Sequence, residues 1–200
     1  MNVVTTPVGK IYPAYRILKE VPEGSVVILP ECVYVKKDKV EKISRQRGLF
    51  VVFNIDPYIE NCGVYNAMLG MEKGEIVWRV RKFYLWENEI RDKPPRWEGI
   101  VDIRGKKTAI VICYEISKVG RAGKLFSLGR EIAEHKSQLL LMPANWHFAW
   151  SIPSGVISLA MKLVDSLEAC AFACTKQYAM ITDRLQSKKI RKYGWDYVEL

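Results

Sequence analysis

Three residues whose side chains serve in nucleophilic catalysis each stand at the end of an apolar run. Glu31 follows the run VVILP, Lys82 follows the alternating stretch EIVWRVR, and Cys113 ends the run TAIVIC. A thiol attacks a carbonyl carbon when a nearby base accepts its proton, and a cation stabilises the charge that then develops on oxygen. A glutamate, a lysine and a cysteine could together supply these functions.

Glu31 comes after a strand that ends at a proline. Such a strand delivers the next side chain to the carboxyl edge of a sheet, where α/β proteins usually bind ligands. The alternative is a surface carboxylate that merely follows a strand.

Lys82 continues one face of an alternating strand. Trp78 and Val80 share that face with it, because successive side chains of a strand point to opposite sides. If the face packs on the core, the ammonium points inward and requires a carboxylate or a ligand oxygen. The alternative is that the strand frays and the long side chain reaches solvent.

Cys113 precedes a stretch that can form a helix. A strand-to-helix bend exposes the side chain and brings backbone N–H groups together, as a nucleophile needs. An inert core thiol is the alternative. The other cysteines are Cys32, Cys62, Cys170 and Cys174; the total is odd and no C-x-x-C pair occurs, so neither a disulfide framework nor a zinc site is indicated.

The elements that would position these residues alternate between short Val- and Ile-rich runs and helical patterns, which is typical of an α/β fold. Helices are predicted over residues 124–136 and 155–168. Turns at residues 72–75 and 104–106 each separate two strand-like stretches and predict hairpins, so the sheet is expected to be mixed.

The composition fits one domain, residues 1–200, with 49% hydrophobic and 26% charged residues. No apolar run approaches the roughly 18 residues of a membrane span and the start is unlike a signal peptide, so we expect a cytosolic protein without a membrane partner. The formal net charge is +9, and basic residues cluster in residues 36–47 and 187–192. We interpret these runs as solvated surface, with an anionic partner such as nucleic acid as the alternative.

Five segments resemble the nitrilase superfamily of carbon–nitrogen hydrolases and follow the order of that family. They are VVILPE (26–31), VRKFYL (80–85), IVICYEI (110–116), LLLMPANW (139–146) and DSLEACAFACTK (165–176). The resemblance covers most of residues 1–180. The tyrosine that follows the cysteine, Tyr114, resembles the pattern of the family's amide-cleaving branches.

The resemblance implies an α-β-β-α sandwich with mixed sheets and a Glu-Lys-Cys triad. Carried onto this chain, Cys113 is the nucleophile, Glu31 the general base and Lys82 the cation that stabilises the oxyanion. The family's second glutamate falls on Glu89, with Glu87 as the alternative because the WENE stretch is one residue short of the usual spacing.

The resemblance also implies the surroundings of the triad. Tyr114 would offer its backbone N–H to the oxyanion, and Glu115, Asn145, Trp146 and His147 would lie at the substrate pocket. Neither a metal nor an organic cofactor is required. The expected partners are a small-molecule amide and further copies of the chain in a homo-oligomer.

The chain departs from the family in being short. The first helix between residues 10 and 22 is abbreviated, the interval from Glu31 to Lys82 is compressed, and no final strands are recognisable after Tyr178.

The expected function is hydrolysis of a non-peptide amide through a cysteine thioester. The alternatives are an acyltransferase that uses the same thioester, or a catalytically silent module whose basic surface binds nucleic acid or protein. A Cys-His arrangement is disfavoured because Cys113 ends a strand rather than opening a helix.

Overall fold

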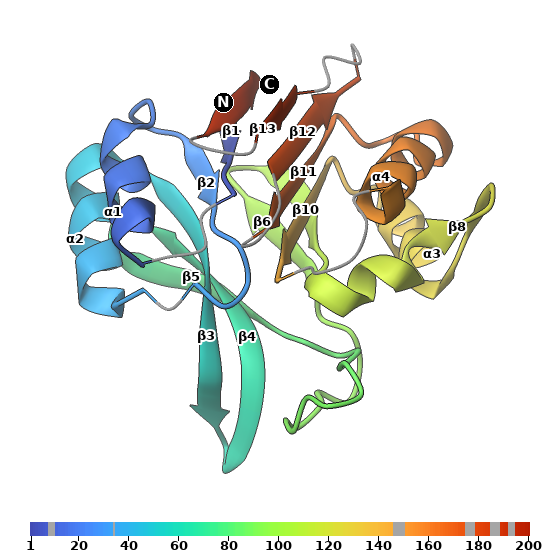
Figure 1. Ribbon diagram of the computed structural model, residues 1–200, viewed down its shortest axis with the longest axis horizontal. Coiled ribbons are helices and arrows are strands. Elements are labelled where there is room, and N and C mark those ends of the chain that lie inside the picture. Colours follow the sequence, from blue (N-terminus) through green and yellow to red (C-terminus); the bar gives the residue numbers. More distant parts are fainter. Residues whose placement is uncertain (8–10, 34, 146–150, 175–178, 185–188, 192–194) are drawn as a thin grey trace.

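The computed structural model describes residues 1–200 except 8–10, 34, 146–150, 175–178, 185–188 and 192–194. Two six-stranded sheets lie face to face, and each carries helices on its outer side (Figure 1). The four-layer α-β-β-α arrangement implied by the resemblance is confirmed.

The first sheet has the order β14-β1-β2-β3-β4-β5. Its strands are β1 (Asn2–Thr5), β2 (Val26–Ile28), β3 (Phe50–Glu60), β4 (Gly63–Glu72), β5 (Glu75–Arg81) and β14 (Asp196–Glu199). The pairs β1–β2 and β2–β3 are parallel and the others antiparallel, so this sheet is mixed, as predicted.

The second sheet has the order β13-β12-β11-β10-β7-β6 and is mixed as well. Its strands are β6 (Ile100–Ile103), β7 (Lys106–Ile110), β10 (Leu139–Ala144), β11 (Ala169–Cys174), β12 (Ala179–Asp183) and β13 (Lys189–Arg191). A short ribbon of β8 (Gly120–Arg121) and β9 (Lys124–Leu125) stands apart from both sheets.

The helices divide between the two outer faces. Helices α1 (Ile11–Glu20) and α2 (Lys37–Arg47) cover the first sheet, while α3 (Ser127–Glu134) and α4 (Ser151–Leu163) cover the second (Figure 1). Among the described residues, no helix combines the length and the apolar character that crossing a bilayer would require.

The apolar runs are continuous because each sheet is covered on both faces. In β2, Val26 and Ile28 pack between the two sheets, whereas Val27 packs under α1 and α2. In the second sheet, Ile110 faces the other sheet and Ala109 faces α3 and α4. The alternation of a strand thus supplies both interfaces at once.

Both predicted hairpins are confirmed. Lys73 and Gly74 connect β4 to β5, and Arg104 and Gly105 connect β6 to β7, all four with positive φ. Two-residue turns of this kind need positive φ at both positions and match the twist of the strands they join.

The two predicted helices exist with different bounds. Helix α3 starts at Ser127 because Ala122 and Gly123 adopt positive φ and fold residues 120–125 into the β8–β9 ribbon. Helix α4 begins at Ser151 and ends at Leu163, earlier than predicted at both ends.

The prediction that no final strands follow Tyr178 was wrong. Strands β12, β13 and β14 lie there; β12 extends the second sheet and β14 pairs with β1 at the edge of the first. These strands are short, and β13 falls within the basic run, so their pattern was weak.

The expectation of a homo-oligomer stays a prediction.

The two helical glycines of the second outer layer allow a matched stability test. A Cβ at Gly129 in α3 would lie 2.0 Å from the carbonyl oxygen of Val119, whereas a Cβ at Gly155 in α4 would meet no atom within 4 Å. We expect Gly129→Ala to lower the free energy of unfolding by about 1–3 kcal/mol through overpacking. Gly155→Ala should raise it by about 0.5–1 kcal/mol, since alanine favours the helix.

Urea unfolding followed by circular dichroism measures both changes. Equal effects of the two substitutions would contradict the close approach of α3 to Val119.

Candidate active site

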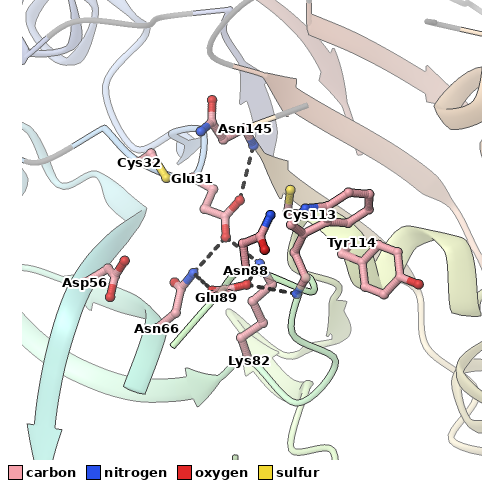
Figure 2. Close-up of a pocket in the computed structure, with 11 residues that line it drawn as sticks. Glu31, Cys32, Asp56, Asn66, Lys82, Asn88, Glu89, Cys113, Tyr114 and Asn145 are labelled. Carbon is pink, nitrogen blue, oxygen red and sulfur yellow. Dashed lines mark hydrogen bonds and ion pairs between the residues drawn. The ribbon is translucent and has the colours of Figure 1, made fainter. Parts of the chain in front are cut away.

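The ends of strands from both sheets meet at one cavity of about 420 Å³. Glu31 follows β2 and Lys82 follows β5 in the first sheet, while Cys113 follows β7 and Asn145 follows β10 in the second. Figure 2 shows these side chains around the cavity. The remaining lining residues are Cys32, Asp56, Asn66, Trp86, Asn88, Glu89 and Tyr114.

Lys82 is buried between two glutamates. Its Nζ lies 2.9 Å from Oε1 of Glu31 and 2.8 Å from Oε2 of Glu89, and the residue is 2% exposed. It shares the inward face of its strand with Val80, as the alternation predicts. Ile76 is exposed instead, because an extra residue in β5 shifts the register beside Gly70 and Met71.

Two asparagines fix the glutamates in place. Asn66 Nδ2 donates to Oε1 of Glu31 at 2.8 Å and to Oε1 of Glu89 at 2.6 Å. The Oδ1 of Asn66 in turn accepts a hydrogen bond from Asn54 Nδ2 at 2.8 Å. Because Asn54 and Asn66 are buried in neighbouring strands β3 and β4, the pairing of those strands sets the orientation of both carboxylates.

Burial and the neighbouring charges set the pKa values of Lys82 and Glu89. Burial alone would lower the pKa of Lys82, but Glu31, Cys113 and Glu89 outweigh it and raise that pKa above its ordinary value. For Glu89, burial acts to raise the pKa, and the attraction of Lys82 overcomes it and lowers the pKa. The ammonium therefore stays charged at neutral pH, with an ionised Glu89 beside it.

Cys113 lies at the bend between β7 and a 3-10 helix, η1 (Cys113–Lys118). Its φ is 49°, a left-handed conformation that a non-glycine residue adopts only where the surroundings enforce it. The side chain is half-buried on the cavity wall. Burial raises the pKa of the Cys113 thiol most, and the negative charge of Glu31 raises it further. The thiol is therefore protonated in the resting protein.

Backbone N–H groups surround the same point. Among the first N–H groups of η1, that of Glu115 donates to the carbonyl oxygen of Ile112 at 3.0 Å, so it is the earlier ones, such as that of Tyr114, that are able to bind an oxyanion. Asn145 N–H donates to Oε2 of Glu31 at 3.3 Å from the opposite wall. The site thus combines a thiol, a carboxylate, an ammonium and backbone donors around a single cavity.

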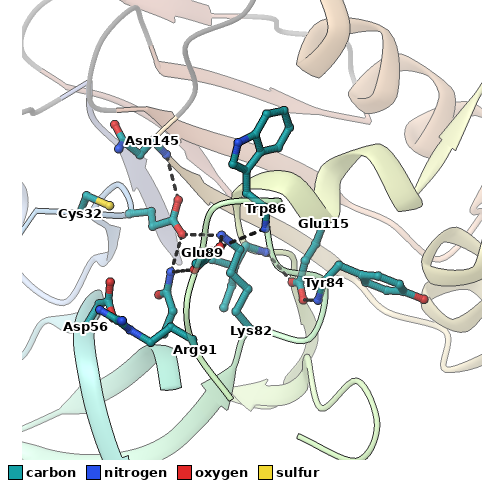
Figure 3. A network of polar contacts seen from close by, with 12 residues as sticks. Cys32, Asp56, Lys82, Tyr84, Trp86, Glu89, Arg91, Glu115 and Asn145 are labelled. Carbon is teal, nitrogen blue, oxygen red and sulfur yellow. Dashed lines mark hydrogen bonds and ion pairs between the residues drawn. The ribbon is translucent and has the colours of Figure 1, made fainter. Parts of the chain in front are cut away.

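Glu115 lies behind the cavity wall, contrary to its expected place among the pocket residues. It is fully buried, and its carboxylate accepts hydrogen bonds from the N–H groups of Ile112 at 2.8 Å, Phe83 at 2.8 Å and Tyr84 at 3.2 Å. Figure 3 shows Glu115 next to Tyr84. The carboxylate ties the segment after Lys82 to the bend that carries Cys113.

The other expected residues divide into three groups. Tyr114 and Asn145 line the cavity, and Glu89 rather than the exposed Glu87 contacts Lys82. Trp146 and His147 lie outside the described residues. Within the described ranges, no group of three or more His, Cys, Asp or Glu side chains could hold a metal ion.

Sequence reasoning missed the asparagines. The available signal was a polar residue inside an apolar strand, Asn54 in LFVVFNI and Asn66 in VYNAML. A buried amide in such a position requires polar partners. The signal does not name them, because the contact between Asn54 and Asn66 depends on strand register.

Solved structures of the nitrilase superfamily share this fold. The chain aligns over 100% of its length with Nit3 of Saccharomyces cerevisiae, described as a member of branch 10 of that superfamily, covering 89% of that chain at 16% identity and a TM-score of 0.74. The chain also aligns with a CN-hydrolase superfamily protein of Xanthomonas campestris that carries an arsenic adduct in its active site. This alignment covers 99% of the present chain and 89% of the other, at 15% identity and a TM-score of 0.71.

An amidase from Nesterenkonia sp. AN1 is similar too. In one structure of a mutant, acrylamide has added to the active-site cysteine; it aligns with 100% of this chain and 93% of its own at 12% identity and a TM-score of 0.77. No protein-family model matches the sequence, and no curated protein matches it. At these identities the comparisons establish the nitrilase-superfamily fold.

Removal of the buried ammonium tests the charge balance of the site. Lys82→Met would leave the carboxylates of Glu31 and Glu89 buried without a cation, so we expect the free energy of unfolding at neutral pH to fall by about 3–5 kcal/mol. The exposed Lys124→Met serves as the control and should change it by less than about 0.5 kcal/mol. Urea unfolding measures both, and equal stability of the two variants would contradict the described ion pairs.

The pH dependence of stability tests Glu115. Burial raises its pKa from 4.5 to about 7, against the opposing effect of hydrogen bonds from three backbone N–H groups. Between pH 4.5 and about pH 7, Glu115 has lost its proton in the unfolded chain but keeps it in the folded chain. The free energy of unfolding therefore falls as the pH rises through this range. At about 1.4 kcal/mol per pH unit, the fall reaches up to about 3 kcal/mol.

Glu115→Gln cannot release this proton and should lack that part of the pH dependence. Urea unfolding of both proteins from about pH 5 to about pH 8 gives the difference curve. A constant difference across this range would contradict the raised pKa.

Proposed function

We propose that the protein is a carbon–nitrogen hydrolase that cleaves a small non-peptide amide through a thioester on Cys113. The observation that carries the proposal is the buried Glu31–Lys82–Glu89 group on the same cavity as a cysteine at a strained bend. A structural thiol needs neither a positive φ nor a buried base and cation beside it. Strained backbone and perturbed ionisable groups together favour a functional site.

In the proposed first step, Glu31 accepts the thiol proton as Sγ of Cys113 attacks the amide carbon. The resting thiol is protonated, so proton transfer and attack proceed together rather than from a stored thiolate. The adjacent base compensates for the low nucleophilicity of the neutral thiol.

The oxyanion that forms needs donors already in place. Lys82 supplies a positive charge held by two glutamates, and the Tyr114 backbone N–H supplies a hydrogen bond from the start of η1. Donors fixed before the reaction need no reorganisation in the transition state, and the loss of one such donor commonly costs about 100- to 1,000-fold in rate.

Collapse of the tetrahedral species breaks the C–N bond. The leaving nitrogen takes the proton from Glu31, and the acyl group remains on Cys113 as a thioester. Water then loses a proton to Glu31 and attacks the thioester, and the acid product leaves as the proton returns to sulfur. Glu89 touches Lys82 and Asn66, and we assign it the positioning of these two side chains.

The substrate is a small molecule. A cavity of about 420 Å³ falls in the ordinary range of small-molecule sites and would not accommodate a folded chain. An acyltransferase would share every step up to the thioester and differ in the acceptor, an amine or another nucleophile in place of water.

Ammonia release from a panel of short aliphatic amides tests the proposal. We expect turnover by the unmodified protein, a loss of at least about 1,000-fold for Cys113→Ala and for Glu31→Gln, and near-normal turnover for Cys62→Ser, whose thiol is exposed outside the cavity. Added hydroxylamine should divert the thioester to a hydroxamate.

The outcomes separate the alternatives. Hydroxamate without acid product would indicate an acyltransferase. No acyl-enzyme by mass spectrometry and no ammonia with any amide would refute the enzyme and favour a silent binding module.

A further inference from the structure

A second cavity, of about 810 Å³, adjoins the first. It lies where η1, the β8–β9 ribbon and α4 come together, and Trp86 and Tyr114 line both cavities. Figure 1 places β8, α3 and α4 at one end of the molecule, on the outer side of the second sheet. The remaining lining residues are Ser117, Lys118, Gly120, Arg121, Ala122, Gly123, Phe126, Gly155, Val156, Ser158, Leu159 and Lys162.

The charge of this second cavity is one-sided. Lys118, Arg121 and Lys162 come from three different elements, and none of the described residues lining the cavity is acidic. Elsewhere in the described chain arginines and lysines pair with carboxylates, but none of those ion pairs includes these three cations. A cavity walled by one sign of charge concentrates ions of the opposite sign.

Lys118 lines the second cavity and lies beside Tyr114, one of the two residues that line both cavities. Its Nζ lies 5.3 Å from the ring centroid of Tyr114 and 5.6 Å from that of Tyr84. Trp86 and Tyr114 meet edge to face with centroids 5.1 Å apart. Cation–π contacts orient the ammonium without neutralising it, so its charge remains available to a ligand.

The spacing along η1 gives the length of a ligand that could span both cavities. Lys118 follows Cys113 by five residues on a 3-10 helix, which at about 2.0 Å per residue separates the two backbone positions by roughly 10 Å. The uncharged lining of the second cavity includes the ring of Tyr114 and the apolar side chains Val156 and Leu159 of α4, together with Ser117 and Ser158.

From these observations we propose that the second cavity binds an anionic group of the substrate, so that the substrate is an amide with a carboxylate or similar anion at its far end, joined by a short apolar chain. The inference rests on the proposed function and specifies its substrate class. Tyr114 then serves both cavities, with its backbone near the reacting carbonyl and its ring beside the ammonium of Lys118.

Binding to the inactive protein tests the inference apart from catalysis. The two ligands are adipic acid monoamide and hexanamide, which have the same number of carbons and differ in the terminal carboxylate. In calorimetry with Cys113→Ala, we expect the monoamide to bind at least about tenfold more tightly, because its carboxylate gains charged hydrogen bonds that hexanamide lacks.

Charge-removing variants locate the effect. Arg121→Gln with Lys162→Gln, made in the Cys113→Ala protein, should reduce the preference to less than about threefold. Lys118 is left unchanged because it contacts Tyr114. Lys124→Gln is the matched control, since Lys124 belongs to the same ribbon as Arg121, is exposed and lies outside the cavity lining; it should keep the preference.

The outcomes that overturn the inference are distinct from those that overturn the hydrolase. Equal binding of the two ligands, no binding of either, or an equal loss with Lys124→Gln refutes the anion site. A change of oligomeric state in the double variant, with selectivity intact, would show that a second copy covers the cavity instead. Selective binding without any amide turnover by the unmodified protein would support the anion site and refute the hydrolase.

Discussion

The site depends on one buried ammonium held between two carboxylates. Lys82 and Glu31 are each almost fully enclosed, and neither charge could be placed there alone, because an isolated ion in such surroundings costs several kcal/mol. Glu89 and Asn66 supply the remaining contacts, so every charge in the group has a partner. The same constraint that makes the group stable also holds a base and a cation at fixed distances beside the thiol.

The two-sheet architecture makes this arrangement possible. Glu31 and Lys82 arrive from the first sheet, and Cys113 and Asn145 from the second, so the packing of the sheets sets the distance between nucleophile and base. The core between the sheets is built from small and branched side chains such as Val26, Ile110 and Ala171, which interdigitate closely. A shift of one sheet against the other would therefore separate the thiol of Cys113 from Glu31 and Lys82, even if each sheet kept its own internal structure.

The sequence predicted those features that depend on local pattern. Strand alternation placed Lys82 on the same face as Val80, which the structure shows to point inward, and the KG and RG turns identified both hairpins. Features that depend on register or on distant partners were not accessible: the spacing of WENE could not choose between Glu87 and Glu89, and nothing local linked Asn54 to Asn66. The resemblance implied that Glu115 lies at the pocket, whereas its carboxylate binds the backbone N–H groups of Ile112, Phe83 and Tyr84 behind the cavity wall.

Glu115 contacts its neighbours only through backbone N–H groups in the hydrogen bonds described above. Any residue except proline offers the same donor, so the side chains at positions 83, 84 and 112 could be replaced by others that fit the space without loss of this contact. The geometry that joins the lysine segment to the cysteine bend is in this way encoded by one side chain and by the path of the main chain. Two chains could diverge until few of their residues coincide and still keep the same junction, which accords with a shared fold at 12–16% identity.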